Sequence, residues 1–274
     1  MRVTAAVGLA LLAIAWLASV AGAQPLRATA PAAYQIVRSQ FSAPPGLFDA
    51  GGQAVCPTGT VVWGGGTAND FANGTINTSA FLGSAGWHAR VNNNAGSTEG
   101  FEVDAICAKK PKLYRFASNQ IDDPAGAQAH GSATCPTGTV LLSGSVLSDG
   151  DTTNVYLLSA SPSGPHSFGA TQENASTSDE PFTVYALCAK KPPGYAIVRV
   201  TQTASGGGGI VVPESYCASG SSVIGGGIQV VKARPAAIMS ASLVGAGTTT
   251  AWLGVVQNEA AASVKVTASV ICAA

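Results

Sequence analysis

The sequence predicts an all-β, disulfide-bonded protein made of three homologous β-sheet repeats, arranged either about a pseudo-threefold axis or as three tandem small β-sandwiches. Two observations predict this fold, the composition and the spacing of the cysteines. Charged residues make up 10% of the chain and hydrophobic residues 46%, with 33 Gly. Low charge with abundant Gly is typical of short strands joined by tight turns. No apolar pattern of helical period follows Ala23.

The N-terminal stretch predicts a secretory signal peptide, residues 1–23. Arg2 precedes an uncharged apolar run that ends at Ala21-Gly22-Ala23, the small-x-small pattern of a cleavage site. The alternative is an uncleaved membrane anchor, because the uncharged run from Val3 to Leu26 is long enough to cross a bilayer. We expect cleavage, and therefore a secreted, extracellular protein that begins at Gln24.

The charge of the mature chain excludes two classes of partner. The whole chain has 14 Lys and Arg against 14 Asp and Glu, so the loss of Arg2 leaves a net charge of −1. Nucleic acids and anionic lipids both require clustered Lys and Arg. We therefore expect no nucleic-acid partner and no membrane association after cleavage. The sequence leaves the oligomeric state open.

Six cysteines divide the mature chain into three units. They form three consecutive pairs of nearly equal spacing, namely Cys56 and Cys107, Cys135 and Cys188, Cys217 and Cys272. The first members of these pairs also recur at nearly equal intervals. The predicted segments are an N-terminal segment 24–33, repeat 1 at 34–111, repeat 2 at 112–194 and repeat 3 at 195–274. A period this long indicates a small β module rather than one turn of a solenoid.

Other residue types recur in the same register, which tests the division. Glycines stand at the third and ninth positions after the first Cys of every unit, at Gly59, Gly138 and Gly220, and at Gly65, Gly144 and Gly226. An aromatic residue stands at one constant distance before the second Cys, at Trp87, Phe168 and Trp252. An Asn stands at another constant distance before it, at Asn93, Asn174 and Asn258. Four independent registers agree on three copies of one module.

Each unit is predicted to contain five or six strands. The approach to every second Cys alternates between apolar and more polar residues, as at Phe101, Val103, Ala105 and Cys107. This period of two indicates a strand with one buried face. In the first unit, further strands are predicted at residues 34–41, 60–68, 75–82 and 86–93.

An even number of cysteines in an exported protein indicates disulfides. Two of the fifteen possible pairings respect the triplication: one closes each unit internally, and the other links neighbouring units, with Cys56 bonded to Cys272. We favour the internal set, because a module of about 80 residues has a marginal core and gains most from its own covalent link. A zinc site is not expected, since Cys-x-x-Cys is absent and the three His residues do not recur in register.

No motif indicates catalysis or a cofactor. The sequence lacks Gly-x-Ser-x-Gly, and its glycine runs lack the Lys and Ser or Thr of a phosphate-binding loop. We expect a protein that is not an enzyme and holds no metal or cofactor. The alternative is an extracellular hydrolase, whose site would be assembled from residues without counterparts in the other units, such as His88, His166, Asp149 and Asp151.

Two further patterns are interpreted as polar turns. Asp149, Asp151 and Asn154 could supply oxygen ligands to Ca²⁺, but their spacing favours a polar hairpin turn. The N-glycosylation pattern occurs at Asn73, Asn77 and Asn174, which we expect in exposed turns.

The recurring aromatic and Asn residues are the candidate ligand contacts. An aromatic ring can cover the apolar face of a sugar while an amide exchanges hydrogen bonds with its hydroxyl groups. The candidate residues are Trp87, Asn93, Phe168, Asn174, Trp252 and Asn258. The alternative interpretation places the aromatic residues in the core and the Asn residues in turns. The predicted partner is a glycan or another cell-envelope polymer.

The stretch CPTGT occurs at residues 56–60 and again at 135–139. Pro fixes φ and Gly permits a left-handed turn, so we interpret it as a turn that begins a strand. Three Cys-bounded units with CPTGTVVWGG at residues 56–65 resemble exported bacterial repeat proteins of unassigned role, and are more distantly similar to vitelline membrane outer layer proteins. The latter resemblance implies a β-prism of three sheets in an extracellular coat with carbohydrate-related associations. We therefore expect a non-catalytic binding or coat protein, with a purely structural role as a further alternative.

Overall fold

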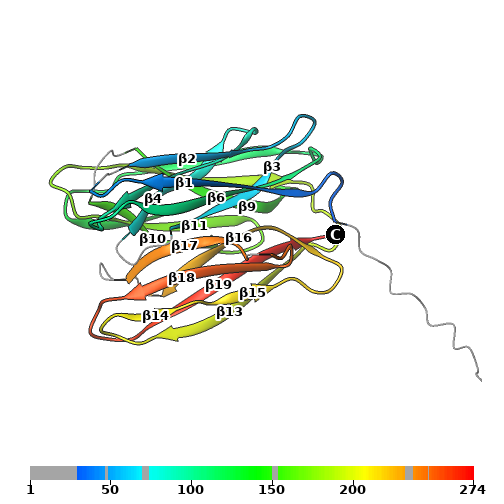
Figure 1. The fold of residues 1–274 in the computed structure, drawn as a ribbon. Coiled ribbons are helices and arrows are strands. Elements are labelled where there is room, and N and C mark those ends of the chain that lie inside the picture. Colours follow the sequence, from blue (N-terminus) through cyan, green and yellow to red (C-terminus); the bar gives the residue numbers. More distant parts are fainter. Residues whose placement is uncertain (1–29, 47–48, 70–73, 150–153, 232–236, 246) are drawn as a thin grey trace, which may run out of the picture.

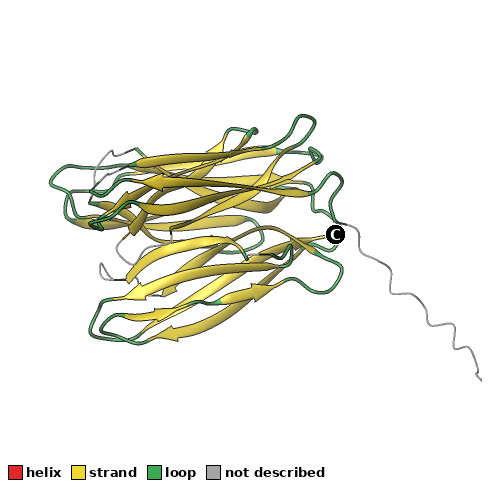
Figure 2. Ribbon diagram, viewed as in Figure 1, coloured by secondary structure: helices red, strands yellow, loops and turns green. Residues whose placement is uncertain are grey.

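The computed structural model describes residues 30–46, 49–69, 74–149, 154–231, 237–245 and 247–274, and these residues form strands, turns and loops without a helix (Figure 2). The all-β prediction is confirmed. The predicted signal peptide and its cleavage site lie outside the described residues. The described ranges contain no helix, and therefore no helix that is long and apolar enough to cross a membrane.

The strands follow the three units. The first unit contains β1 (Gln35–Ala43), β2 (Ala50–Val55), β3 (Val61–Asn69), β4 (Gly74–Leu82), β5 (Gly86–Asn93) and β6 (Glu99–Ala108). The second contains β7 (Arg115–Ile121), β8 (Ala127–Thr134), β9 (Val140–Ser148), β10 (Val155–Pro162), β11 (Ser167–Asn174) and β12 (Phe182–Ala189). The third contains β13 (Ala196–Ala204), β14 (Gly209–Val211), β15 (Glu214–Tyr216), β16 (Ser222–Val231), β17 (Ala237–Val244), β18 (Ala251–Asn258) and β19 (Val264–Ala273).

Three antiparallel sheets result, and each is shared by two units. Sheet A has the order β1-β6-β3-β17-β18-β14, with β15 also paired to β18. Sheet B has the order β2-β5-β4-β9-β12-β7, and sheet C has the order β13-β19-β16-β10-β11-β8. Figure 1 shows sheet A at the front, with β1 above and β14 below. Because every unit contributes strands to two sheets, the units are not three tandem sandwiches, and the pseudo-threefold alternative holds.

The units meet through closely packed backbone at equivalent bulged positions. The pairings of β3, β9 and β16 each contain one bulged residue, which is Trp63, Leu142 or Ile224. A Cβ added to Gly64 would overlap the carbonyl oxygen of Ile224 in the third unit. Glycine at this position therefore permits the approach of backbone from another unit.

The interior is one hydrophobic cluster to which all three units contribute. The residues predicted to face inward before the second Cys are buried in the first unit, at Phe101, Val103, Ala105 and Cys107. The intervening Asp104 and Ile106 are 0% exposed as well, so the predicted alternation with exposed residues is wrong for the end of this strand, which is covered on both faces. The corresponding strands of the other two units bury Val184 and Val266. A sheet buried on its inner face against two other sheets accounts for this period.

The repeated turn has the predicted backbone. The φ angles of Gly59, Gly138 and Gly220 are 87°, 83° and 83°, in the left-handed region that glycine adopts without strain. In the first copy, the Thr60 amide donates to the Pro57 carbonyl at 3.1 Å, immediately before β3 begins. The stretch CPTGT therefore forms a turn that begins a strand.

The three disulfides follow the internal pairing, joining Cys56 to Cys107, Cys135 to Cys188 and Cys217 to Cys272. Each bond links the turn that begins β3, β9 or β16 to the last strand of its unit, and the Cα atoms are 5.6 Å apart in every case. Three structural disulfides indicate that the protein matures in an oxidising environment.

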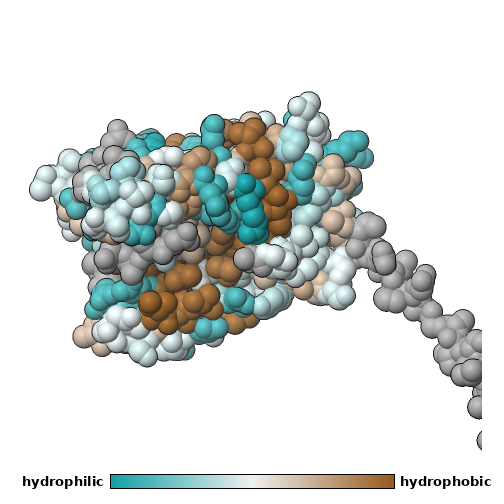
Figure 3. Space-filling view, viewed as in Figure 1, coloured by the Kyte–Doolittle hydropathy of each residue, from teal (hydrophilic) through white to brown (hydrophobic). Residues whose placement is uncertain are grey.

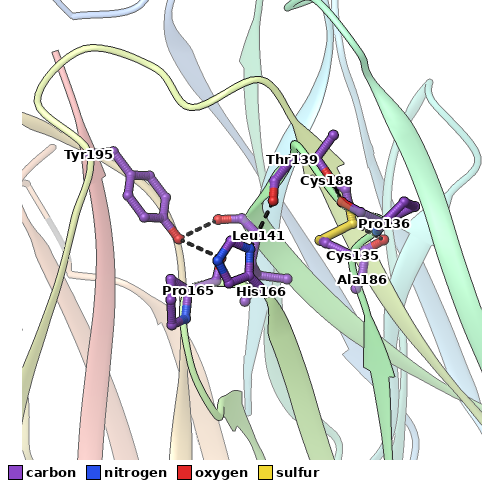
Figure 4. The surroundings of a disulfide bond; sticks show 9 residues. All are labelled: Cys135, Pro136, Thr139, Leu141, Pro165, His166, Ala186, Cys188 and Tyr195. Carbon is purple, nitrogen blue, oxygen red and sulfur yellow. Dashed lines mark hydrogen bonds between the residues drawn. A yellow bond between two sulfur atoms is a disulfide. The ribbon is translucent and has the colours of Figure 1, made fainter.

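A tyrosine at the start of each unit connects it to another unit. The Tyr34, Tyr114 and Tyr195 hydroxyl groups donate to the carbonyls of Val223, Val62 and Leu141, at 2.7, 2.8 and 2.9 Å. Each accepting residue stands six positions after the first Cys of its unit. The first unit thus bonds to the third, the second to the first and the third to the second. Figure 4 shows the third of these contacts, beside the disulfide of the second unit.

Candidate functional site

The six predicted ligand contacts lie in the interior. Trp87, Phe168 and Trp252 are each 2% exposed, and the three Asn residues Asn93, Asn174 and Asn258 are 0% exposed. A ring covered on both faces cannot stack on a ligand at the surface. The structure therefore corrects the interpretation of these residues as ligand contacts and supports the alternative of core and turn.

The recurring aromatic and the recurring glycine explain one another. A Cβ on Gly65 would overlap the Trp87 ring, and the same holds for Gly144 with Phe168. In the third unit Gly226 makes the corresponding contact with Trp252. Each unit contributes one half of each of two sheets. In every unit the aromatic ring from one of these half-sheets lies on the glycine backbone of the other. This packing accounts for two of the four sequence registers.

Each recurring Asn ties a hairpin turn to the end of a neighbouring strand. The Asn93 amide donates to the carbonyls of Ala43 and Ser97 at 2.8 and 2.9 Å, and its oxygen accepts from the Ala95 amide at 2.8 Å. Asn174 and Asn258 make the same type of contacts in their units. A fully buried side-chain amide needs all of these partners.

The glycosylation patterns are not in exposed turns, contrary to expectation. Asn77 is 0% exposed within β4, where its side chain donates to the Asn92 oxygen at 3.2 Å. Asn174 is equally buried. Neither nitrogen is accessible in the folded protein, and Asn73 lies outside the described residues.

The described residues of the alternative hydrolase site, His88, His166 and Asp149, are not assembled. His88 lies in β5 of sheet B, where burial and then the charge of Arg90 lower its pKa. His166 lies in the β10–β11 turn, and its Nδ1 donates to the carbonyl of Thr139 at 2.9 Å (Figure 4). Asp149 follows the far end of β9, about 30 Å along the strand from Thr139.

The predicted polar turn at 149–154 shows no cation site among the residues that can be described there. Asp149 accepts a hydrogen bond from the Gln120 amide at 3.2 Å. Asp151 lies outside the described residues. Within the described ranges, no group of three His, Cys, Asp or Glu could hold a metal ion.

A polar trough crosses the outer face of sheet C. The register of the sheet places two rows of residues on this face, one of Arg199, Ser269, Gly227, Ser161, Gly169 and Ser132, the other of Thr201, Thr267, Gln229, Ser159, Thr171 and His130. Nine of these twelve side chains carry a hydroxyl group, an amide or an imidazole. The alternate residues Ala268, Ile228 and Ala170 face the core.

The trough is a hollow of about 330 Å³ over the second unit's half of sheet C. Its polar lining is His130, Ser132, Ser159, Ser161, Ser163, Thr171 and Gln229, and its floor is Gly169 with the backbone of Gly131 and Ala170. We use the term sheet C trough for this set. Glycine leaves the floor open, because a Cβ on Gly169 would meet its nearest atom only at 3.6 Å.

Part of the polar lining is already engaged and part is available. Ser159 donates to the Ile228 carbonyl at 3.3 Å, and Ser163 exchanges a hydrogen bond with Ser167 at 2.8 Å. Across the described chain, the side chains of Ser132, Ser161 and Gln229 make no hydrogen bond to another protein group. Ser132 and Gln229 are exposed, whereas Ser161 is 5% exposed. The available groups both donate and accept, which suits a ligand rich in hydroxyl groups.

The unit that supplies the trough also contains a buried polar pair beneath it. Gln172 donates to Asp123 at 3.1 Å, and both side chains are 0% exposed. Burial raises the pKa of Asp123 to about 6, although the Gln172 hydrogen bond lowers it. The first unit has Ala43 and Val91 at the corresponding positions, so the pair is not required by the module.

Sequence reasoning missed the trough because the residues that recur in register are buried. A signal for it is present in the sequence, where Ser159, Ser161 and Ser163 alternate at a period of two. In a strand this period places all three on one face. With the fold and this trough described, the comparisons with known proteins add no further assignment: no protein-family model matches the chain, and no curated protein matches it.

Proposed function

We propose that this is a secreted, non-catalytic binding or coat protein that recognises a glycan or another hydroxyl-rich polymer of a cell envelope through the sheet C trough. One observation carries the proposal. Hydroxyl, amide and imidazole groups line a hollow of about 330 Å³ whose floor lacks large side chains. Ligand sites commonly fall in the range of about 300 to 1,000 Å³, so the trough has room for a sugar unit.

The physical setting of the trough supports a polymer rather than an isolated small molecule. The rows of polar residues continue over neighbouring strands to Thr201 and Thr267, whose hydroxyl groups lie 2.8 Å apart. An extended chain can therefore make further contacts beyond the trough. Many weak polar contacts of this kind favour recognition by repetition. The proposed export of the protein, based on residues 1–23 and the three disulfides, would place it where such polymers occur.

The proposal predicts binding that depends on the open floor of the trough. The mature protein is incubated with insoluble cellulose, chitin and peptidoglycan and with soluble β-glucan, and the bound fraction is measured. Gly169→Leu should abolish binding, because the added side chain fills the floor. The third unit carries Leu253 at the equivalent position of β18, so the substitution is compatible with the module.

His88→Leu is the matched control, because His88 occupies the same position in the first unit and lies on sheet B. It should leave binding unchanged. Thermal unfolding of both variants checks that the fold is intact. Equal binding by the wild type and the folded Gly169→Leu variant, or no binding by the wild type to any of these polymers, contradicts the proposal.

A further inference from the structure

The third unit's half of sheet A has an apolar outer surface. Its outward positions lie on β17, β18, β14 and β15 and at one residue between the last two strands. We call this set the unit-3 face: Ala241, Leu243, Ile238, Leu253, Val255, Gln257, Ile210, Val212 and Glu214. Seven of these nine residues are apolar, and two of the seven, Ala241 and Leu243, are buried at 3% and 5% exposure. Ile210 is 61% exposed and Val212 is 45% exposed.

The other two units provide an internal comparison for this face. At the equivalent positions the first unit has Thr78, Ala80, Thr75, His88, Arg90, Asn92, Asp49, Gly51 and Gln53. The second unit has Ser159, Ser161, Tyr156, Gly169, Thr171, Glu173, Gln128, His130 and Ser132. Both sets are mainly polar. The fold therefore does not require apolar residues at these positions, and their presence in the third unit needs another cause.

The apolar positions are contiguous on the surface. Figure 3 shows a brown patch over β18 and β14 with teal side chains around it. Contiguous apolar patches with a polar rim mark interaction sites on soluble proteins. We propose that the unit-3 face is a self-association surface, on which a second copy of this chain packs with its own unit-3 face.

A twofold axis parallel to β18 brings like strands together. Under this symmetry β18 lies over β18 of the second copy, and β17 lies over β14. The row of Val255 would then pack on itself, and Ile238 would pack on Ile210 of the second copy. The two sheets would form a face-to-face sandwich, for which twisted sheets of this kind are suited.

Charges at the rim are complementary in this arrangement. The Arg38 side chain reaches across sheet A, and its guanidinium donates to the Gly245 carbonyl at 3.2 Å, beside Leu243 at the end of β17. The same guanidinium forms an ion pair with Glu102 at 3.3 Å. Glu214 is at the opposite edge of the unit-3 face, in the row of Leu253. The same axis places Glu214 of the second copy over Leu243, next to Arg38. Arg38 would then lie between Glu102 of its own chain and Glu214 of the second copy, and a guanidinium has enough donors for two carboxylates. This contact favours the second copy over a neutral apolar ligand.

The edge of the sheet is protected against a different mode of association. Pro213 separates β14 from β15, whereas the equivalent edge strands β2 and β8 are continuous. Proline has no amide hydrogen to donate to an added strand. Association through the face of sheet A is therefore favoured over strand addition at its edge.

The area indicates reversible association. Three strands spaced by about 4.8 Å and three rows spaced by about 6.8 Å give a face of about 300 Å² on each copy. This is less than the roughly 800 Å² per partner of a standard interface. We expect a dimer that forms as the concentration of the mature protein rises, rather than a permanent one.

Sedimentation velocity of the disulfide-bonded mature protein over a wide concentration range tests the proposal. The wild type should shift from monomer to dimer. The triple variant Ile210→Gln, Val212→His and Val255→Thr carries the second unit's residues at the same positions, so the module accommodates them. It should raise the dimer dissociation constant at least about tenfold. Glu214→Lys should also weaken the dimer, most clearly at low salt.

Thr171→Val is the matched control, since it makes the reverse change at the position of Val255 in sheet C; the dissociation constant should not change. A wild type that stays monomeric at every concentration overturns the proposal. So does a dimer that the triple variant forms equally well. If the wild type is monomeric but binds liposomes of neutral phospholipid, and the triple variant does not, the occupant is a lipid surface and the second-copy proposal is wrong.

Discussion

The buried aromatic residue of each unit is matched to the residue that it contacts on the neighbouring strand. In the first unit the Trp87 indole donates to the Ser79 hydroxyl at 2.9 Å, and in the third Trp252 donates to Ser242 at 3.2 Å. The second unit has Phe168, which has no donor, and Ala160 in place of the serine. The indole N–H and the half-buried serine hydroxyl satisfy one another, so both members of the pair differ together. Ser79 also shares a hydrogen bond with the Thr67 hydroxyl at 3.2 Å.

This coupling predicts the result of a double-mutant cycle in the first unit. Trp87→Phe and Ser79→Ala should each destabilise the protein, by roughly 1 kcal/mol or more, and Trp87→Phe more because it also leaves space. The double variant, which recreates the pair of the second unit, should be less destabilised than the sum. Urea unfolding of the four proteins measures the coupling. Strict additivity would contradict it.

Asp104 is a buried acid found in one unit only. It is 0% exposed, and the Arg38 guanidinium lies 3.8 Å from its carboxylate. Burial raises the pKa of Asp104 from 3.8 to about 8, and Arg38 offsets only part of this shift. The equivalent residues Tyr185 and Ser269 are neutral, so the module does not depend on a carboxyl group here.

The raised pKa of Asp104 predicts that the free energy of unfolding falls as the pH rises. Between the unfolded pKa of 3.8 and the folded pKa of about 8, the folded protein holds a proton at Asp104 that the unfolded chain has lost. The contribution of this group is therefore present below pH 4 and is lost as pH rises toward 8. Asp104→Asn should flatten the profile, with a melting temperature that exceeds the wild type increasingly from pH 5 to pH 8. Parallel profiles for the two proteins would rule out this role.

At the scale of the strand, local chemistry recurs because the same backbone contacts recur. The glycine nine positions after the first Cys receives the aromatic ring of its own unit, and the glycine before it in β3 and β16 admits backbone from another unit. These requirements involve a missing Cβ, so they are visible in the sequence as constant spacing. The polar outward residues of the same strands have no such requirement and differ freely among the units.

Each unit begins with the same local structure, a residue of positive φ followed by a tyrosine. Ala33, Leu113 and Gly194 precede the three tyrosines and all have φ between 56° and 65°. This left-handed residue turns the chain into the first strand of each unit, so that the tyrosine hydroxyl reaches a carbonyl of another unit. Burial raises the pKa of all three tyrosines and keeps each hydroxyl as a donor.

Removal of these hydroxyl groups should weaken the contacts between units. Tyr195→Phe leaves the Leu141 carbonyl without this donor and should cost about 1 kcal/mol, and the equivalent changes at Tyr34 and Tyr114 should cost about the same. Chemical unfolding measures the loss. Tyr185→Phe, on the outer face of sheet B, is the control and should cost less than about 0.5 kcal/mol. Equal losses in all four variants would contradict a special role for the ring of tyrosines.

At the scale of the molecule, the sharing of sheets makes the units interdependent. Each unit forms two half-sheets, and the inner edge of each half-sheet pairs with a strand of another unit. For example, β4 pairs with β9, and β10 pairs with β16. The internal disulfide holds the two half-sheets of a unit together but does not cover these edges. A unit separated from the others would expose unpaired strands and part of the common core.

This interdependence predicts that residues 112–194 do not form a stable monomer alone, even with Cys135 and Cys188 oxidised. Circular dichroism and dispersion of amide signals in the fragment measure its structure. The whole mature chain should instead unfold in one cooperative transition. A fragment that is folded and monomeric would show that the units are autonomous modules.

The sequence by itself determined the all-β class, the triplication, the turn at each first Cys and the preferred internal disulfides. The class, the triplication and the turn follow from short-range requirements, such as a left-handed glycine or a period of two, that leave a signature at a constant spacing. The disulfide preference follows from the marginal core of a module of about 80 residues. Only the tertiary structure decided that each sheet joins two units, that Trp87 and Asn93 are interior, and that polar and apolar outer faces lie on sheets C and A. Those facts depend on which strands pair across long separations and on bulges that change the outward face, and neither is encoded in any local stretch of residues.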